Sequence, residues 1–269
     1  MNKHIDLDVV SSKHKGLKGF FEILLRRFKV VTQIAIMLPV YFIGCLIFGL
    51  SAAPGIWVYK SITENFNEGF LGYFATGFSL SLGFFVFGFT LLFLVPLINF
   101  LFRCYLKPWR GPYYSYEAFM WYLHNALVYM PRFTFLNFIT PSPLANLFYQ
   151  MMGMKIGRGT IINTVYISDP SLITLGKKVT LGGSVTLVAH YGQQGLLVIS
   201  PVKIGDNCTL GLKSSVMGGV TIGNNVKILP HSVIMPKTTI PDDEIWGGVP
   251  AVKIVHEPKK DLAPLKISS

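Results

Sequence analysis

The hydrophobic positions of this chain follow two different patterns, one in each half. Residues 30–59 and 70–102 are two long apolar runs that contain no Asp, Glu, Lys or Arg. Each run exceeds the roughly 20 residues with which a helix crosses about 30 Å of hydrocarbon. The alternative, two buried core helices of a soluble protein, requires an unusually long stretch without charge. The pattern therefore predicts two transmembrane helices within residues 30–110.

The second pattern is a repeat of six residues. From residue 204 onward an aliphatic residue returns at every sixth position: Ile204, Leu210, Val216, Ile222, Ile228, Ile234 and Ile240. A period of six fits neither a helix nor an uninterrupted alternating strand, and it is typical of a solenoid in which three short faces close one coil. The same rhythm appears upstream at Ile156 and Ile162, and it resumes out of phase at Leu175. The repeat predicts a parallel β-helix of about five coils over residues 153–256.

The repeat is interrupted between Leu187 and Ile204, where three hexads would need one more residue than the chain provides. The interruption contains His190 in the segment HYGQQG. Glycine-flanked loops on a rigid scaffold often carry functional residues, because the scaffold fixes their position. His190 is therefore the first candidate for chemistry.

The segment that joins the two halves, residues 111–152, is apolar but interrupted. Its many Tyr and Trp residues favour the headgroup region of a membrane. We expect one helix from about Tyr113 that stops at Pro131, and a second from Pro143, capped by Ser142, to Gly153. These helices would form an interfacial connector; the alternative is that they pack only on the C-terminal domain.

Composition and charge agree with a membrane protein. The chain is 51% hydrophobic and 14% charged, with a formal net charge of +11. Its Lys and Arg are spread along the sequence without an interleaved basic and aromatic motif, so we expect no nucleic-acid partner. Most of the positive residues near the runs lie before the first run, in a basic N-terminal segment (residues 1–29), or after the second run, at 103–110, rather than in the loop that joins the two runs. This asymmetry predicts an integral inner-membrane protein whose termini, β-helix and C-terminal tail (residues 257–269) are cytoplasmic.

The pair Ile156-Gly157, the aliphatic ladder and the ending GGVPA make residues 153–256 resemble the hexapeptide-repeat acyltransferases. This resemblance implies a left-handed parallel β-helix that works as a homotrimer. It also implies an acyl-coenzyme A donor, acetyl-coenzyme A first of all, that lies between subunits as a co-substrate, with no tightly bound cofactor. The order of segments from about residue 110 also resembles the membrane-embedded C-terminal units of poly-lysine-synthetase-type nonribosomal peptide synthetases.

The resemblance implies that His190 is the general base. Imidazole suits this role because its ordinary pKa lies near 6.5. The related units carry an acidic residue three positions after the histidine, where this chain has Gln193. Either a carboxylate from elsewhere or a backbone carbonyl would then have to orient His190.

The other histidines are weaker candidates. We interpret His231 as structural and His124 as an interfacial helix residue; His256 follows the β-helix, and His4 and His14 lie in the polar N-terminal segment. A zinc site is the alternative use of histidine. The separations of His190, His231 and His256 do not match whole coils of 18 residues, so we expect no metal site.

Glycines that permit close approach and lysines that supply positive charge are the expected donor-binding residues, together with one tryptophan that either flanks the adenine or caps the core. They are Lys213, Gly218, Gly219, Lys227, Trp246, Gly247 and Gly248. The irregular first coils suggest the acceptor-binding residues Asn163, Thr164 and Asp169, with Gln193 from the break.

The sequence thus predicts a membrane-bound acyltransferase that acts on a hydroxyl or amine of a membrane lipid, a lipid-linked molecule or another membrane-associated acceptor. Two alternatives stay open. One is an aminoacyl or peptidyl transferase whose donor is a pantetheine thioester on a carrier protein. The other is a non-catalytic membrane scaffold subunit.

Overall fold

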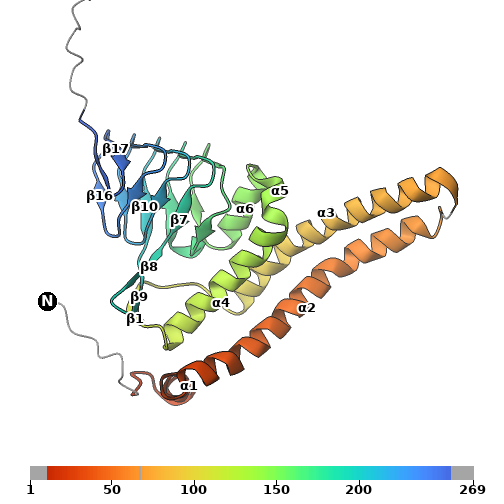
Figure 1. Cartoon of the computed structure of the whole chain (residues 1–269), viewed down its shortest axis with the longest axis horizontal. Helices are drawn as coiled ribbons and strands as arrows, with labels where there is room; N and C mark the ends of the chain where they lie inside the picture. The colour runs from red at the N-terminus through yellow and green to blue at the C-terminus, as the bar shows by residue number, and fades with distance from the viewer. Residues whose placement is uncertain (1–10, 67, 256–269) are drawn as a thin grey trace, which may run out of the picture.

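The computed structural model describes residues 11–66 and 68–255. Two long helices, α2 (Lys29–Thr63) and α3 (Gly69–Leu101), form a hairpin that extends away from the rest of the chain (Figure 1). Their bounds match the two predicted apolar runs. Both are long and apolar enough to cross a membrane, and only 12% and 33% of their most hydrophobic windows are buried. Most of the surface of both helices is therefore exposed in this structure.

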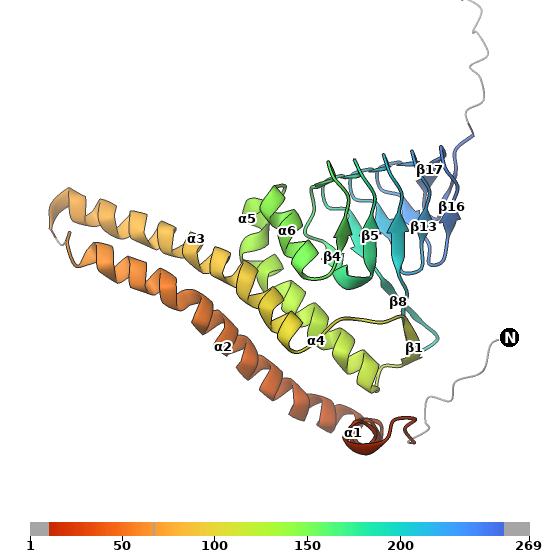
Figure 2. The ribbon, with the colours of Figure 1, turned by 180° about the vertical axis from the view of Figure 1, so that it is seen from behind.

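A collar of short helices lies between α3 and the C-terminal half (Figure 2). It consists of α4 (Tyr116–Pro131), η1 (Arg132–Leu136), α5 (Asn137–Ile139) and α6 (Pro143–Met151). Ser142 caps α6 as predicted, because its side chain accepts a hydrogen bond from the backbone N–H of Ala145. The α-helix α4 ends at Pro131 as predicted, and the chain continues directly into the wider π turn of η1.

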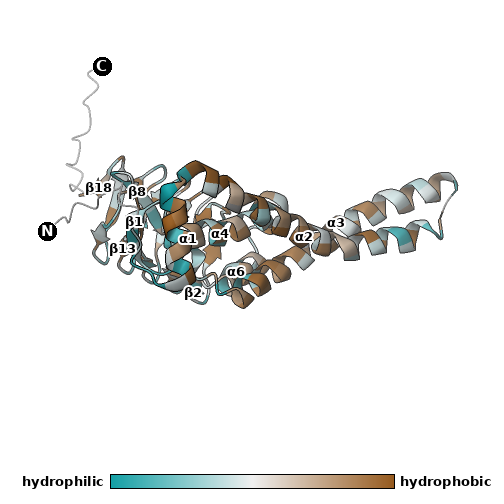
Figure 3. Cartoon of the chain, turned by 90° about the horizontal axis from the view of Figure 1, so that it is seen from below, coloured by the Kyte–Doolittle hydropathy of each residue, from teal (hydrophilic) through white to brown (hydrophobic). Residues whose placement is uncertain are grey.

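A further helix, α1 (Gly16–Arg27), lies in the N-terminal segment that the sequence analysis described only as basic. Its buried face is made by Gly19, Glu22 and Leu25, while Leu17 and Phe20 point away from the protein and are 88% and 65% exposed. A helix with so narrow a buried face gives little hydrophobic signal. Hydrophobic residues dominate much of the helical region in Figure 3, and hydrophilic ones gather towards the β-helix.

The C-terminal half is a parallel β-helix with three sheets, named here in the order in which the chain enters them. The first sheet contains β2 (Lys155–Ile156), β5 (Ile173–Leu175), β10 (Val202–Ile204), β13 (Thr221–Ile222) and β16 (Thr239–Ile240). The second contains β3 (Ile161–Ile162), β6 (Thr180–Leu181), β11 (Thr209–Leu210), β14 (Lys227–Ile228), β17 (Ile245–Gly248) and the antiparallel β18 (Ala251–Lys253). The third contains β4 (Ile167–Ser168), β7 (Thr186–Val188), β12 (Ser215–Val216) and β15 (Val233–Ile234).

The six-residue repeat builds the axial core of this β-helix. All seven predicted ladder residues from Ile204 to Ile240 are at most 2% exposed, and successive coils pair in register, as Ile204 does with Ile222. At the corner between the first and second sheets, Asp206, Asn224 and Asp242 stack with a spacing of 18 residues through side chain to backbone hydrogen bonds of 2.8 and 2.7 Å. The predicted parallel β-helix is confirmed.

The predicted break is an insertion at one corner rather than a missing coil. The chain leaves the third sheet at Ala189 and returns at Ser200, whose N–H donates to the Ala189 carbonyl at 2.8 Å. The inserted residues form a hairpin of β8 (His190–Gln193) and β9 (Leu196–Ile199). The strand β1 (Trp109–Pro112), which lies where the predicted transmembrane region meets the connector, completes a three-stranded antiparallel sheet by pairing with β9. This strand was not predicted, because four residues carry almost no pattern.

Gly88 of α3 makes the docking of the collar possible, and it provides a test. A Cβ at this position would lie 2.1 Å from the ring of the fully buried Phe135 of η1, whereas a Cβ at Gly77 in the same helix would meet nothing. We expect Gly88→Ala to lower the free energy of unfolding by about 1–3 kcal/mol, the usual effect of overpacking.

The control Gly77→Ala should leave stability unchanged or slightly raised, because alanine is the better helix former. Thermal unfolding of both variants in the same detergent measures the difference. Equal melting temperatures would show that the collar does not pack on α3 in this way.

Candidate functional site

His190 and Asp169 form a hydrogen-bonded pair at the corner between the third and first sheets. Asp169 follows β4 in the first coil, and His190 begins the inserted hairpin one coil further on. The Nδ1 of His190 lies 2.5 Å from the Oδ2 of Asp169. The Asp169 side chain is completely buried, whereas that of His190 is 23% exposed. The pair therefore has a closed end at the carboxylate and an open end at the imidazole.

Helix α4 of the collar holds the carboxylate from the other side. The Oδ1 of Asp169 accepts hydrogen bonds from the Trp121 indole N–H at 2.9 Å and from the Asn125 side-chain amide at 2.7 Å. Its Oδ2 also accepts the backbone N–H of Ala189 at 3.0 Å. The Trp121 ring meets the His190 ring edge to face, with centroids 4.9 Å apart. Both rotamers of the pair are thus fixed by neighbours.

These contacts decide the protonation of the pair. Burial alone would raise the pKa of Asp169, but the hydrogen bond and charge of His190 and the Asn125 amide together hold that pKa below its ordinary value. An ionised carboxylate only accepts hydrogen bonds, so the Nδ1 of His190 is the donor. The neutral imidazole then carries its free lone pair on Nε2. Among the residues that the structure describes, none makes a hydrogen bond to this nitrogen.

Gln193 has no part in this arrangement. It lies three residues after His190 on the same strand, so its side chain leaves the opposite face of the hairpin, and it is exposed. A carboxylate at position 193 would therefore face away from the imidazole. The orienting group comes from the previous coil instead, and Asp169 supplies it.

The donor-binding candidates are divided between two corners of one protomer. Gly218 and Gly219 lie one coil below His190: a Cβ on Gly218 would come within 2.9 Å of the Ala189 and His190 backbone. Gly219 already donates its N–H to the Ser200 carbonyl at 3.1 Å. Gly247 packs instead on Leu229 and Gly248 follows it at the end of β17, on the corner between the second and third sheets.

The remaining donor-binding candidates lie on the second sheet or at the corner between the second and third sheets. Lys213 follows β11 near the same corner, and Lys227 is exposed on β14. Trp246 takes the core register of Ile228 and packs against the axial core, and its indole N–H donates to Glu244 at 2.7 Å. Of its two expected roles, this placement favours the core cap.

The acceptor candidates are separated as well. Asn163 is exposed after β3, at the corner between the second and third sheets. Thr164 is buried, and its hydroxyl donates to the Val185 carbonyl at 2.8 Å. Asp169 has no free surface, because it is enclosed behind His190. The structure thus brings Asp169 to His190 and leaves Asn163 and Thr164 at another corner.

Asp169, Trp121 and Asn125 are the functional residues whose roles sequence reasoning missed. A spacing of 18 residues places position 172 above His190, and the irregular first coil shifts the true neighbour to Asp169. In that coil Asp169 adopts a left-handed backbone conformation before the short 3-10 turn Pro170–Leu172. The spacing signal existed, but the slip in the repeat concealed it.

His124 lies on the far side of the pair and differs from the expectation of an interfacial residue. It is completely buried, and its Nδ1 lies 3.0 Å from the side-chain oxygen of Asn99 near the end of α3. Burial lowers the pKa of His124 to about 4, although the negative charge of Asp169 opposes that shift. His14 is also ordered, and its Nε2 contacts Glu117 at 2.8 Å. His4 and His256 lie outside the described residues.

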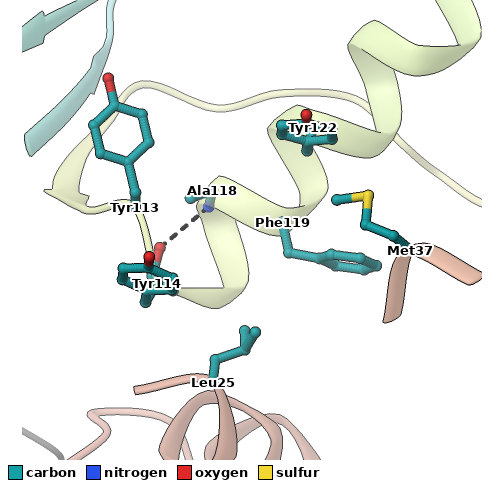
Figure 4. A pocket seen from close by; sticks show the side chains of 8 residues that line it. Leu25, Met37, Tyr113, Tyr114, Ala118, Phe119 and Tyr122 are labelled. Atoms are coloured by element: carbon teal, nitrogen blue, oxygen red, sulfur yellow. Dashed lines mark hydrogen bonds between the residues drawn. The ribbon is translucent and has the colours of Figure 1, made fainter. Parts of the chain in front are cut away.

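A small apolar pocket lies on another face of the first turn of α4 (Figure 4). It is lined by Leu25, Met37, Tyr113, Tyr114, Ser115, Ala118, Phe119 and Tyr122. Neither His190 nor Asp169 contributes to its wall, so it is separate from the candidate site. Within residues 11–66 and 68–255, no group of three or more His, Cys, Asp or Glu side chains is arranged to hold a metal ion.

Comparisons with known proteins agree with the repeat. Residues 201–236 match the family model described as bacterial transferase hexapeptide (six repeats). The hexapeptide-repeat resemblance is confirmed. The chain is also 27% identical over 147 residues to the delta-poly-L-ornithine synthetase of Acinetobacter baumannii, a match that covers 55% of this chain and 11% of that protein.

Two further similar proteins match a smaller share of this chain. Over 111 residues it is 33% identical to the 2,3,4,5-tetrahydropyridine-2,6-dicarboxylate N-succinyltransferase of Polynucleobacter asymbioticus, which covers 40% of this chain and 39% of that one. A solved galactoside acetyltransferase in complex with coenzyme A is 21% identical, covers 49% of this chain and 80% of its own, and has a TM-score of 0.39. The chain thus spans well under half of the two curated relatives.

The buried histidine next to the pair predicts a specific pH dependence of stability. An unfolded histidine takes up a proton near pH 6.5, whereas folded His124 resists protonation until about pH 4. Between these values the unfolded state binds more protons, so stability should fall by up to a few kcal/mol as the pH is lowered. The contribution of Asp169, whose pKa is depressed, is lost only below its ordinary value of 3.8.

We therefore expect His124→Gln to flatten the melting temperature between pH 7 and pH 4.5. The exposed His231 serves as the matched control, and His231→Gln should retain the wild-type slope. If the His124 variant kept that slope, the histidine would not be buried in its neutral form.

Proposed function

We propose that this protein is an acyltransferase that moves an acyl group from a pantetheine thioester, acetyl-coenzyme A first of all, to a hydroxyl or amine. The observation that carries the proposal is the His190–Asp169 pair, a hydrogen-bonded imidazole whose second nitrogen is open at the surface of a hexapeptide-repeat β-helix. The sequence match to transferase hexapeptides supports the reaction class.

The pair suits a general base. The Nε2 of His190 accepts the proton of the acceptor as its oxygen or nitrogen attacks the thioester carbonyl. The resulting imidazolium is stabilised by the Asp169 carboxylate, whose bond to Nδ1 also keeps the reactive lone pair on Nε2. When the tetrahedral intermediate collapses, the carbon–sulfur bond breaks and the thiolate takes the proton from Nε2. The four donors around Asp169 keep it ionised throughout, so the proton stays on the histidine.

The division of the donor candidates between two corners supports a homotrimer of left-handed β-helices. One protomer offers Gly218 and Gly219 beside His190, whereas Lys213, Gly247 and Gly248 lie at the next corner. In a three-fold assembly the second corner of one subunit can face the His190 corner of its neighbour. The donor would then lie between subunits, with its phosphates near lysines and its thioester at His190.

A pantetheine arm on a carrier protein is a second candidate donor. It presents the same thioester as coenzyme A, and the resemblance to a delta-poly-L-ornithine synthetase favours an aminoacyl or peptidyl group. The same pair would deprotonate an amine acceptor. Which donor is used decides the acyl group but not the role of His190.

The catalytic proposal is tested by transfer of radiolabelled acetyl groups from acetyl-coenzyme A to bacterial membrane extracts. We expect His190→Ala to reduce transfer by about 100-fold to 10,000-fold, because the general base is lost. Asp169→Asn should also reduce it strongly, because the imidazole loses its orienting acceptor. The control Lys177→Ala, which is exposed at the corner between the first and second sheets, should keep full activity and the same oligomeric state.

A transfer rate of His190→Ala equal to wild type would remove the proposed role. Purified protein that neither transfers label nor shows a thermal shift with acetyl-coenzyme A or a carrier-bound thioester would favour the non-catalytic scaffold.

We also propose that α2 and α3 span the inner membrane, with the β-helix on the cytoplasmic side. Support comes from the exposure of large apolar side chains along both helices, such as Leu46 at 50% and Phe74 at 62%. The basic residues on the collar side agree with the positive-inside rule. Acceptors that are lipid-linked or otherwise membrane-associated would then reach the collar from the bilayer.

The orientation can be measured with reporter fusions. Alkaline phosphatase inserted into the loop between α2 and α3 should be active, because the loop would be periplasmic, whereas a fusion after residue 255 should be inactive. The reverse activities would place the β-helix outside the cytoplasm, and two inactive fusions would argue against spanning helices.

A further inference from the structure

Arg132, the first residue of η1, is held by aromatic rings and has no anionic partner. Its guanidinium carbon lies 4.6 Å from the centroid of the Tyr166 ring and 5.1 Å from those of Tyr129 and Phe133. Across residues 11–66 and 68–255, no carboxylate pairs with Arg132 and no group accepts a hydrogen bond from it. The aromatic faces attract the cation and fix it in place, but they leave its five N–H donors unused.

Two polar groups in this region, one of them on Arg132 itself, are buried without a hydrogen-bond partner among the described residues. The Nε of Arg132 and the hydroxyl of Tyr149 are both inaccessible to solvent and have no partner among the described residues. Tyr149 is completely enclosed, and burial raises the pKa of its hydroxyl while the positive charge of Arg132 opposes that shift. An ordinary surface arginine satisfies its donors with water, whereas this one is partly withdrawn from solvent and preorganised.

The depth of Arg132 along the helical hairpin indicates what lies beside it. Phe135 of the same turn packs against Gly88 of α3 and against the ring of Phe89 at 5.3 Å. Gly88 lies 19 residues from Gly69, the start of α3, which corresponds to about 30 Å of helix and to the thickness of the hydrocarbon layer. If the hairpin spans the bilayer, η1 lies at the cytoplasmic headgroups.

The neighbours of Arg132 fit that level. Phe133, one of the rings against the guanidinium, is 74% exposed, so an apolar ring and a positive charge occur together at this surface. A guanidinium binds phosphate oxygens with its planar fork of donors, and it does so while stacked on aromatic rings. Lipid phosphates are the anions that are concentrated at this depth.

The arginine is also connected to the candidate catalytic pair. The hydroxyl of Tyr129, one of the rings under Arg132, lies 3.0 Å from the Ser168 hydroxyl. Ser168 directly precedes Asp169 on the irregular first coil. A phosphate at Arg132 would therefore lie near the same coil that orients His190.

We propose that Arg132, with Tyr129, Phe133 and Tyr166, forms a binding site for the phosphate group of a membrane lipid at the cytoplasmic surface. The inference rests on the proposed placement of α2 and α3 in the membrane and names the chemical class of ligand beside the catalytic pair. The site holds the headgroup phosphate while the lipid chains remain in the bilayer next to α3.

The test is lipid binding to the full-length protein in neutral detergent, followed by native mass spectrometry. The probes are phosphatidylglycerol, a diacylglycerol with the same chains, and inorganic phosphate. We expect saturable binding of phosphatidylglycerol, weakened at least tenfold in Arg132→Gln and several-fold in Arg132→Lys, which keeps the charge but lacks the fork. Diacylglycerol and inorganic phosphate should bind weakly and equally to all variants.

Arg158→Gln is the matched control, because it removes the same charge from an exposed position in the first coil. It should bind phosphatidylglycerol like wild type, and melting temperatures confirm that each variant is folded. Equal binding by both glutamine variants, or equal binding of diacylglycerol, would overturn the proposal. Binding of inorganic phosphate alone that disappears in Arg132→Gln would replace the lipid with a soluble anion.

The measurement does not depend on catalysis. His190→Ala should bind phosphatidylglycerol as wild type does, even if it transfers no acyl group. Loss of lipid binding in Arg132→Gln with normal acetyl transfer to a soluble acceptor would separate the two sites. Loss of transfer in His190→Ala with intact lipid binding would separate them in the other direction.

Discussion

The carboxylate of Asp169 joins the two halves of the molecule. Two of its hydrogen bonds come from α4 of the collar and two come from the corner of the β-helix that begins the His190 hairpin. A buried charge is tolerated only when its acceptor capacity is filled, so this carboxylate is satisfied only when both halves are in place. The position of His190 therefore depends on the packing of a helix that is remote in sequence. Because α4 packs in turn on α3, the geometry of the imidazole is linked to the long hairpin.

The features that the sequence predicted well are those set by periodic hydrophobicity. The ladder from Ile204 to Ile240 specifies a coil of three hexads, since every sixth side chain must enter a narrow core, and the structure follows it. The charge-free runs likewise fixed the bounds of α2 and α3 to within a few residues. Ser142 was recognised as a cap because the chemistry of a helix start is local.

The features that the sequence did not predict depend on contacts between distant segments. Pairing of β1 with β9 joins two short strands that have no pattern of their own. Asp169 could be named as a residue of an irregular coil, but its role requires the exact offset between coils, and a slip of a few residues in the first coil hid that offset. The resemblance points to position 193 because related units carry an acidic residue there, yet the alternation of the strand directs Gln193 away from His190. A role for Arg132 could not be predicted, because nothing in the sequence around it distinguishes it from the other basic residues.

The pairing of β1 with β9 also has a consequence for synthesis. The chain makes β1 first, and its partner follows only after about 85 further residues, which take roughly 4 to 17 seconds at ordinary rates of translation. During that interval β1 has no partner from β9. The edge of β1 therefore stays unpaired while the ribosome makes the rest of the chain. This order of synthesis favours folding in which the helical collar forms first and the β8–β9 hairpin pairs with β1 last.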